Sequence, residues 1–317
     1  MRPQFTLEMS GHKVHLGERT LIMGVLNVTP DSFSDGGLYV DSERAIKHGV
    51  EMARQGADWI DVGGESTRPG SKPVTAEEEL RRVLPVIRGM HKRLRALPIS
   101  IDTTKAEVAE QSARAGASII NDVSGLRFDP HLAEVARRHG AALILMHIRR
   151  RPETMQRKPF ARSIWRSLGQ GLARSIRQAL SSGIRRSQLI LDPGLGFGKT
   201  RCQNFEIVAQ LHRLRRFGLP ILVGASRKSF VQAIVAGEGL QPGQRRSGPP
   251  QTWPLTLRAG VSLNGETREP AAASRLEVGD AAMLTAAILE GVHIVRVHDV
   301  QAALPAVRIA DALLAAR

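Results

Sequence analysis

Short apolar runs recur along the chain, and segments with helical spacing, such as Ala106–Ala115 and Leu132–Arg138, lie between them. The eight runs are Leu21–Val28, Trp59–Val62, Ile99–Ile101, Ser118–Ile120, Ala142–Met146, Leu189–Leu191, Pro220–Val223 and Ile294–Val297. Each is nearly continuous in apolar residues, which is typical of strands buried on both faces of a parallel sheet. Eight such strands alternating with helices predict an α/β fold, and eight strands close a (β/α)8 TIM barrel.

Two segments lie outside this alternation. Residues 1–20 precede the first strand, and Lys13–Leu16 predicts one strand of a hairpin that closes the barrel floor. Residues 237–274 are rich in Pro, Gly and Gln and show little apolar periodicity. We therefore expect a mobile surface insertion between the seventh and eighth strands rather than a second domain. Residues 1–317 are expected to form one barrel domain.

Polar residues stand just past the apolar part of nearly every run. They are Asn27, Asp61, Asp102, Asn121–Asp122, His147, Asp192, Ser226–Arg227–Lys228 and Arg296–His298. The carboxyl ends of parallel barrel strands meet on one face, so these groups are expected to converge there. A single such residue is explained equally well as a helix cap, but a series of them favours a functional site.

Composition narrows the class of protein. The 317 residues include one cysteine, Cys202, which excludes an internal disulfide and an all-cysteine zinc site. No apolar run approaches the roughly 18 residues that cross a bilayer. The N-terminus lacks the hydrophobic stretch of a secretory signal. We therefore expect a soluble, cytoplasmic protein without a membrane partner.

The net charge of +15 is concentrated in one part of the chain. Between Arg149 and Arg216 there are 16 Lys and Arg residues against 3 acidic ones, an excess of +13. This window could attract a polyanion such as nucleic acid. However, apolar residues recur every four positions over Ile164–Leu180 with arginines off that stripe, which predicts an amphipathic helix with a basic outer face. Few aromatic residues accompany these arginines, so we favour a solvated surface and expect no nucleic-acid partner.

The segment Leu191–Thr200 superficially matches a phosphate-binding Walker A loop. That motif requires glycine where Pro193 stands. Proline lacks an N–H group and fixes φ, so the cradle of backbone donors would be broken. This excludes a nucleoside-triphosphate loop here.

Several motifs in chain order resemble those of dihydropteroate synthases, a pterin-binding family. They are Met23–Gly37, Asp61–Gly70, Ile101–Thr103, Asn121–Gly125, Asp192–Lys199, Ser226–Phe230 and Arg296–Val300. The resemblance covers about residues 12–236 and 275–315. It implies a (β/α)8 transferase of folate biosynthesis, acting as a homodimer. The reaction would join 6-hydroxymethyl-7,8-dihydropterin pyrophosphate to p-aminobenzoate, giving 7,8-dihydropteroate and pyrophosphate.

The resemblance places a pterin pocket at the strand ends. It implies that Asp102, Asn121 and Asp192 bind the ring edge together with Lys228. These residue types suit that role, because carboxylates and amides pair well with the N–H and carbonyl groups of a pterin. The residues implied to lie against the ring faces are Met146 and Phe197.

Arg296 and His298 are two positions apart, so on a strand both side chains point to the same side. The resemblance implies that they bind pyrophosphate together with Thr67 and Arg68. It also implies that Asn27 contacts the pyrophosphate and supplies an oxygen ligand to Mg²⁺, the expected cofactor. A structural ion pair of Arg296 and a turn cap at Asn27 are the alternatives.

The second substrate site is also implied by the resemblance. Its p-aminobenzoate-binding residues would be Phe33, Thr67, Arg68, Pro69, Lys228 and Ser229. The chemistry needs no protein nucleophile, because the pterin stabilises a cation at the methylene while charge develops on the departing pyrophosphate. The implied catalytic residues are Arg68, Lys228, Arg296 and His298.

The chain departs from the family pattern at two places. Arginines follow His147 where a glycine is usual, and a usual run of small residues is altered over Arg275–Asp280. Two other functions stay open at this point. A folate-dependent methyltransferase would share the pterin pocket without a pyrophosphate clamp, and a non-catalytic paralogue could bind nucleic acid through the basic window.

Overall fold

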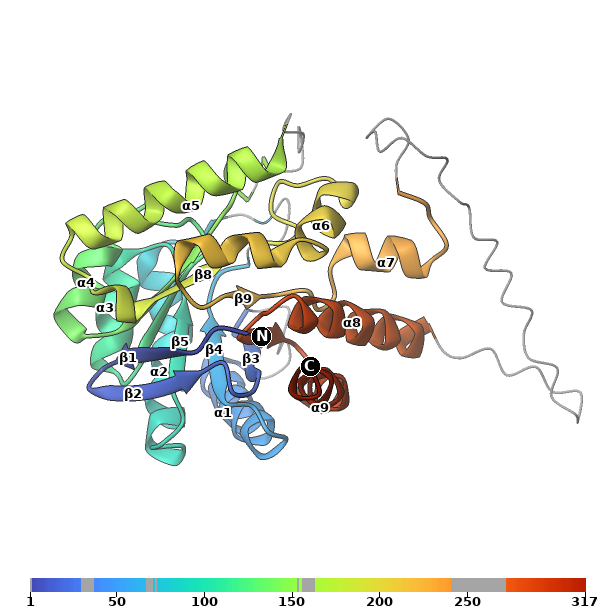
Figure 1. Cartoon of the computed structure of the whole chain (residues 1–317). Helices are drawn as coiled ribbons and strands as arrows, with labels where there is room; N and C mark the ends of the chain where they lie inside the picture. The colour runs from blue at the N-terminus through green and yellow to red at the C-terminus, as the bar shows by residue number, and fades with distance from the viewer. Residues whose placement is uncertain are drawn as a thin grey trace, which may run out of the picture.

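The computed structural model describes residues 2–29, 37–66, 71, 73–152, 154–155, 163–240 and 272–317. Its centre is an eight-stranded parallel sheet in the order β8-β7-β6-β5-β4-β3-β10-β9 (Figure 1). The strands are β3 (Leu21–Asn27), β4 (Trp59–Gly63), β5 (Ile99–Asp102), β6 (Ile119–Asp122), β7 (Ala142–Met146), β8 (Leu189–Asp192), β9 (Leu222–Val223) and β10 (Ile294–Val297). A parallel bridge between Leu191 and Ile221 joins the two ends of the sheet. The predicted (β/α)8 barrel is therefore confirmed.

Helices follow the strands and cover the outside of the barrel (Figure 1). They are α1 (Gly37–Arg54), α2 (Ala76–Arg93), α3 (Ala106–Arg114), α4 (Leu132–His139), α5 (Ile164–Ser181), α6 (Arg201–Val208), α7 (Ser229–Val235), α8 (Ala272–Leu289) and α9 (Val300–Ala315), with the short 3-10 helices η2 (Arg186–Gln188) and η3 (Leu211–Phe217). The start of α2 shows which local interactions begin a helix in this chain. The Thr75 hydroxyl accepts a hydrogen bond from the Glu78 N–H at 3.2 Å, and three glutamates occupy the first turn. No helix among the described residues is long and apolar enough to cross a membrane.

The predicted strands agree with the observed ones to within a few residues. Ala142–Met146 and Ile294–Val297 have the predicted bounds. Several other strands extend to include the polar residue that follows the apolar run, so Asp102 and Asp192 belong to the sheet itself. The strand predicted from Pro220 is instead the two-residue β9. The carbonyl oxygen of Pro220 still accepts from the Leu191 N–H at 2.9 Å, but proline has no N–H to donate in return.

The N-terminal hairpin closes the barrel floor as predicted. Its strands β1 (Phe5–Met9) and β2 (His12–Leu16) are antiparallel. Leu7, Met9 and Leu16 are fully buried and pack in one cluster with residues of the barrel strands such as Trp59. The floor is therefore a second apolar core that seals the end of the barrel opposite the carboxyl ends of the strands.

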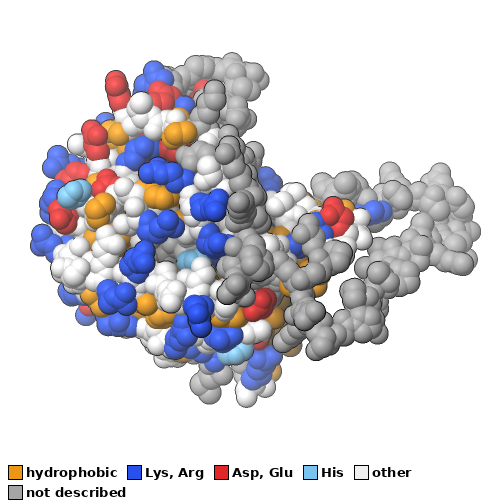
Figure 2. All heavy atoms as spheres, turned by 90° about the horizontal axis from the view of Figure 1, so that it is seen from above, with side chains coloured by type: hydrophobic (Ala, Val, Ile, Leu, Met, Phe, Trp, Pro, Cys, Tyr) orange, Lys and Arg blue, Asp and Glu red, His pale blue; other side chains and the backbone are white. Residues whose placement is uncertain are grey.

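Helix α5 has the amphipathic character that its sequence predicts. Its buried side includes Ile164, Leu168, Leu172 and Ile176, whereas Arg166, Arg174 and Arg177 are exposed. Figure 2 shows Lys and Arg side chains over much of the face seen from above. The basic window thus contributes surface charge while the apolar stripe holds the helix on the barrel.

The predicted insertion ends earlier than the sequence analysis placed it. Residues 241–271 lie outside the described residues, so the structure does not test the insertion itself. Ala272–Ser274, however, belong to α8 rather than to an irregular segment. The alanine-rich sequence directly after Pro270 has high helix propensity, and the helix therefore begins before the apolar periodicity becomes visible.

His293 joins the N-terminal segment to the barrel. Its Nδ1 accepts from the Ile221 N–H at 3.1 Å and its Nε2–H donates to the Pro3 carbonyl at 2.9 Å, which fixes a neutral ring. Burial lowers the pKa of His293 to about 4. The neutral form is thus favoured in the folded state, and its contribution to stability is complete above about pH 6.5 and lost as the pH falls through 4.

We predict that replacing His293 with Asn makes unfolding less dependent on pH between 6.5 and 4. The wild type should lose up to about 3 kcal/mol more than the variant over this interval. Urea unfolding at several pH values measures the difference, and the exposed His12→Asn variant serves as the control. An equal pH dependence in the wild type and in His293→Asn would contradict the assignment.

Candidate active site

The strand register brings four of the predicted residues to the carboxyl ends of neighbouring strands. Asp102 of β5 stands opposite Asn121 of β6, and Met146 of β7 stands opposite Asp192 of β8. These residues belong to neighbouring strands, and all four are buried. The barrel therefore collects polar groups and one apolar wall residue at the same end.

Arg296 of β10 holds the buried carboxylates together. Its Nε donates to Asp61 Oδ2 at 2.6 Å and its Nη2 donates to Asp102 Oδ2 at 2.9 Å. The same Asp61 oxygen accepts from Asn121 Nδ2 at 2.9 Å. Each partner is more than nine-tenths buried. The alternative of a structural ion pair for Arg296 is therefore real, and the pair lies inside the site.

One guanidinium cannot fully neutralise two buried carboxylates. Burial raises the pKa of Asp102 to about 8, with Arg296 acting in the opposite direction and the neighbouring Asp61 adding to the rise. The Asp102 carboxyl is thus poised to lose a proton when a ligand brings further hydrogen-bond donors. A raised pKa of this kind is common at functional sites, where burial and charge are arranged together.

The loop after β8 is folded tightly over the loop after β7. Asp192 Oδ1 accepts from the Gly194 N–H at 2.6 Å, and burial raises the pKa of Asp192. Gly194 has φ of 67°, and an added Cβ would lie 2.3 Å from the His147 carbonyl oxygen. The Lys199 amine donates to the carbonyls of His147, Gly194 and Phe197 at 3.0, 2.7 and 3.2 Å. Lys199 therefore braces this loop, which agrees with the exclusion of a Walker A lysine.

An apolar wall faces the polar strand ends. Its buried members are Val123, Met146, Ile148 and Met155. Phe197 packs against this cluster, and the Lys228 amine lies 4.4 Å from the centre of the Phe197 ring. Burial, followed by the charge of Arg296, lowers the pKa of Lys228 to about 8. The site thus combines acidic and amide groups, an aromatic wall and one amine, a set that suits a flat ring with a polar edge.

Asn27 ends β3 beside the acidic residues. A methyl group added to Gly63 would lie 3.7 Å from Asn27 Oδ1 and 3.9 Å from Asp102 Oδ2, so both oxygens border the same small space. No group of three or more His, Cys, Asp and Glu side chains among the described residues is arranged to hold a metal ion. Asn27 alone suits Mg²⁺ carried largely by phosphate oxygens and water, which is the usual way that this ion is bound with phosphate substrates.

Two further predicted residues, His298 and Ser229, follow neighbouring strands. His298 comes directly after β10, and its Nδ1 lies 3.4 Å from Oγ of Ser226 in the loop after β9. Ser229 begins α7 and is exposed.

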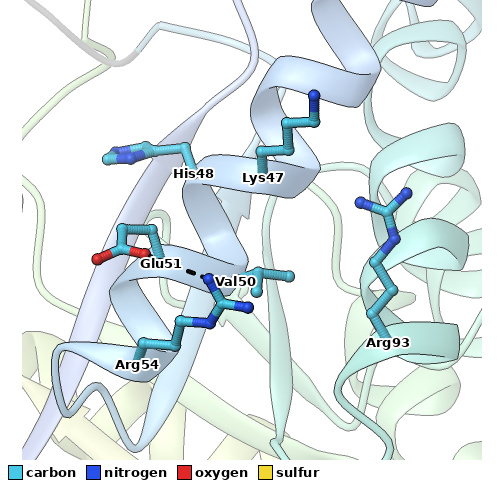
Figure 3. Close-up of a pocket in the computed structure, with 6 residues that line it drawn as sticks. All are labelled: Lys47, His48, Val50, Glu51, Arg54 and Arg93. Atoms are coloured by element: carbon cyan, nitrogen blue, oxygen red, sulfur yellow. Dashed lines mark ion pairs between the residues drawn. The ribbon is translucent and has the colours of Figure 1, made fainter.

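A hollow of about 770 Å³ lies elsewhere, on the outer surface at α1 and the end of α2 (Figure 3). The residues that line it come from α1 and, in the case of Arg93, from the end of α2. Glu51 pairs with Arg54 at 3.8 Å, and Arg93 pairs with Glu43 at 3.0 Å. We regard this hollow as solvated surface, because its charges are largely paired and the polar strand ends are remote from it in the fold.

The comparisons with known proteins agree with this arrangement. The family model described as pterin-binding enzyme matches residues 23–298. The dihydropteroate synthase of Synechocystis is 41% identical over 297 residues, which cover 94% of this chain and 91% of the relative. This chain belongs to the dihydropteroate synthase family.

Solved structures of the family have the same fold. The dihydropteroate synthase of Yersinia pestis with a sulfonamide drug complex has a TM-score of 0.80 and 35% identity, covering 99% of this chain and 100% of that one. The enzyme of Xanthomonas albilineans with 4-aminobenzoic acid has a TM-score of 0.79 and 35% identity, covering 99% of both chains.

The predicted site residues fall into two groups, those that the structure describes and those that lie outside the described residues. The structure gathers Asp102, Asn121, Asp192 and Arg296 around one end of the barrel, with Met146, Phe197 and Lys228 at its wall. The remaining predicted residues, Phe33, Thr67, Arg68 and Pro69, lie outside the described residues.

Two polar strand-end residues do not converge as predicted. Asp122 follows an inward-facing residue, so its side chain turns away and accepts from the Ser124 N–H at 2.8 Å. His147 likewise lies next to α5, where its Nε2 is 3.4 Å from Ser167 Oγ. Burial lowers the pKa of His147 well below its ordinary value. Side-chain alternation along a strand therefore separates structural residues from site residues.

Two residues that help to hold the site together, Asp61 and Lys105, have no predicted role in the sequence. Asp61 is one of the polar strand-end residues of the sequence but has no predicted role, although it contacts both Arg296 and Asn121. The available signal is its position as the first residue of the Asp61–Gly70 motif, directly before the Val-Gly-Gly sequence. Lys105 pairs with Glu65 and with the buried Glu79, and so holds the base of the loop that continues toward residues 67–70. Only the tertiary structure reveals that contact.

We predict that replacing Arg296 with Met destabilises the fold by about 2–4 kcal/mol, because two buried carboxylates lose their shared cation. The loss should grow between pH 6 and pH 9. Burial raises the folded-state pKa of Asp102 to about 8, so the carboxylate that Arg296 stabilises forms only as the pH approaches and passes that value. Urea unfolding at the two pH values measures this. The exposed Arg227→Met variant is the matched control and should change stability little. An equal loss of stability for Arg296→Met at both pH values would contradict the shared-cation model.

Proposed function

We propose that the chain is a dihydropteroate synthase, a transferase of folate biosynthesis that joins 6-hydroxymethyl-7,8-dihydropterin pyrophosphate to p-aminobenzoate. The family match and the relatives, whose solved structures include complexes with 4-aminobenzoic acid and with a sulfonamide, support this function. The observation that carries it is the buried set of Asp102, Asn121 and Asp192 beside the Phe197 wall. A flat heterocycle with N–H and carbonyl edges fits such a set.

In this proposal the strand-end acids bind the pterin edge. Asp102 and Asp192 accept from the N–H groups of the ring, and Asn121 supplies an amide from the intervening strand. Asn121 can hold one orientation because its Nδ2 donates to Asp61 at 2.9 Å. Met146 and Phe197 lie against the ring faces, and the Lys228 amine beside Phe197 donates to a ring acceptor. Water is largely displaced from this end of the barrel, which strengthens these polar contacts.

The departing pyrophosphate lies toward β10 and β3 in the proposal. Arg296 and His298 donate to its oxygens as negative charge develops, and Thr67 and Arg68 approach from the loop after β4. Arg296 is already oriented by Asp61 and Asp102, so little reorganisation is needed at the moment of reaction. Asn27 would hold Mg²⁺, which supplies charge stabilisation to the phosphate oxygens when bound.

The amine of p-aminobenzoate then bonds to the pterin methylene as the C–O bond to pyrophosphate breaks. The electron-rich pterin stabilises cationic character at the methylene, so no protein nucleophile is required. The proposed site for p-aminobenzoate comprises Phe33, Thr67, Arg68, Pro69, Lys228 and Ser229. Lys228 belongs to both subsites and can meet the acidic end of the second substrate, while the amine that attacks loses its proton to solvent.

Association, location and domain content are further parts of the proposal. We expect one barrel domain in a cytoplasmic homodimer. Val278 of α8 and Ile309 and Leu313 of α9 are exposed at 70%, 62% and 48%, and such apolar side chains on adjacent helices support an association surface. Analytical ultracentrifugation of the purified chain would show the dimer or a monomer.

The proposed activity is tested by pyrophosphate release. The purified chain is supplied with Mg²⁺ and dihydropterin pyrophosphate, with and without p-aminobenzoate. Release that depends on p-aminobenzoate, together with formation of dihydropteroate, is expected. Release of pyrophosphate unaffected by p-aminobenzoate, or no release at all, would contradict the synthase assignment.

We predict that Asp192→Asn weakens pterin binding at least about tenfold, because it replaces a charge-assisted hydrogen bond with a neutral one. The KM for p-aminobenzoate should change less than about twofold. Asn retains an oxygen that can accept from Gly194, so the loop is preserved. Calorimetry with a pterin analogue measures the effect, with Asp129→Asn on the loop after β6 as the control. Unchanged pterin affinity in Asp192→Asn would contradict its role.

We also predict that sulfonamides inhibit competitively with p-aminobenzoate and form a pterin–sulfonamide adduct with Mg²⁺ present. The first two loop motifs, Phe33–Gly37 and Ser66–Ser71, contain no inserted residue relative to the family pattern. Steady-state kinetics at several p-aminobenzoate concentrations tests this. Inhibition that saturating p-aminobenzoate does not relieve would show that the drug acts elsewhere.

A further inference from the structure

The loop between β9 and α7 has a strained backbone next to the proposed active site. Ser226 and Arg227 follow β9, and Lys228 is the residue before α7. Arg227 has φ of 56°, in the left-handed region that a residue other than glycine seldom adopts. Such a conformation is unfavourable for a residue with a side chain and persists only when surrounding contacts enforce it.

Those contacts come from Asp280 on α8, 53 residues further along the chain. Asp280 Oδ2 accepts from the Arg227 backbone N–H at 2.9 Å. The same oxygen accepts from the Ser226 hydroxyl at 3.3 Å. Helix α8 thus supplies one carboxylate that holds two successive residues of the loop.

Ser226 links Asp280 to His298 of the proposed pyrophosphate site. Its Oγ lies 3.4 Å from Nδ1 of His298, and the serine is itself buried. A hydroxyl has a single proton to donate. When that proton is directed to Asp280, Ser226 Oγ can only accept from His298, so Nδ1 of the imidazole must carry a proton. The lone pair of the neutral ring is then on Nε2, and this atom must take up a proton before His298 can donate to a pyrophosphate oxygen.

We propose that Asp280 is a positioning residue of the active site, which fixes the orientation and tautomer of His298 through Ser226 and holds the loop that presents Lys228. This inference rests on the proposed function for its catalytic consequence. Asp280 acts through other residues, because its carboxylate contacts Ser226 and Arg227. Hydrogen bonds from outside the reacting groups commonly set the tautomer of a functional histidine in this way.

Four variants separate this role from a general effect on stability. Asp280→Ala removes the acceptor, and Ser226→Ala breaks the link to His298 while leaving the contact between Asp280 and the Arg227 N–H. Asp280→Asn retains an oxygen that can accept both hydrogen bonds. Glu277→Ala is the matched control, because Glu277 is an exposed carboxylate one turn earlier on α8 and lines the same small pocket as Ser226 and Asp280.

The first readout is the imidazole itself, measured in the ligand-free protein by ¹⁵N–¹H correlation spectra that report which ring nitrogen carries the proton. The His298 signals are assigned from the spectrum of His298→Asn. We expect an Nδ1–H ring in the wild type, in Asp280→Asn and in Glu277→Ala. Asp280→Ala and Ser226→Ala should shift the population toward the Nε2–H form. A wild-type ring protonated on Nε2, or no shift in either alanine variant, would overturn the proposal.

The second readout is steady-state kinetics. Asp280→Ala and Ser226→Ala should each lower kcat about tenfold, and the double variant should be no worse than the more impaired single variant, because both interrupt one pathway. Asp280→Asn should stay within about threefold of wild type, and Glu277→Ala should leave kcat unchanged. Fully additive losses, or an equal loss in Glu277→Ala, would overturn the proposal.

The two readouts distinguish the inference from the function on which it rests. The tautomer is measured without turnover, so a chain that lacks synthase activity would refute the proposed function while the spectra still test the link from Asp280 to His298. If Asp280→Ala does not fold, Ser226→Ala provides the same test from the other end of the pathway. Active enzyme with an unchanged His298 tautomer in Ser226→Ala would contradict the inference alone.

Discussion

Arg296 lies between two carboxylates, and most features of the site depend on this arrangement. Asp61 and Asp102 are both buried, and each receives a hydrogen bond from the guanidinium. Without that cation, two like charges would lie in a poorly solvated space, which proteins normally avoid by protonating one group. The pairing keeps both carboxyls in place as hydrogen-bond acceptors at the centre of the barrel, while burial still raises the pKa of Asp102 to about 8. It also orients Arg296 itself, so that the same side chain serves the fold and, in our proposal, the departing anion.

The barrel makes this arrangement possible because its core is divided. The hairpin β1–β2 and the lower halves of the strands form an apolar floor, while the upper ends of the strands carry polar groups. The buried acids of the site therefore lie at one end, where Asp61, Asn121 and Arg296 bond to one another across the strands. The loops after β7 and β8 complete the wall, and Lys199 stabilises their contact by donating to three carbonyls. Burial lowers the pKa of Lys199 to about 7, whereas its three carbonyl acceptors match the three N–H donors of the charged form.

Much of the fold can be predicted from the sequence, because a strand that is buried on both faces appears there as a continuous run of apolar residues. The same pattern cannot tell which strand-end residue faces inward. Asn121 enters the site while Asp122 turns into its own loop, and no composition signal distinguishes these neighbours. Asp61 illustrates the complementary difficulty, since its importance lies in contacts with residues about 60 and 235 positions away. Asp280 reaches the loop after β9 only through the packing of α8, whereas the sequence shows only that a usual run of small residues is altered over Arg275–Asp280.

The most direct test of this account is the protonation state of Asp102 in the presence and absence of a pterin. ¹³C spectra of labelled aspartate carboxyls, with Asp102 assigned from the Asp102→Asn variant, would follow its titration. In the protein without a pterin, the Asp102 carboxyl is expected to titrate far above the ordinary range of an aspartate, at about pH 8. A bound pterin should lower the pKa of Asp102 and release a proton near neutral pH, because ring N–H donors favour the carboxylate. Titration of the free protein near pH 4, or a carboxyl that gains a proton when the pterin binds, would contradict the central claim.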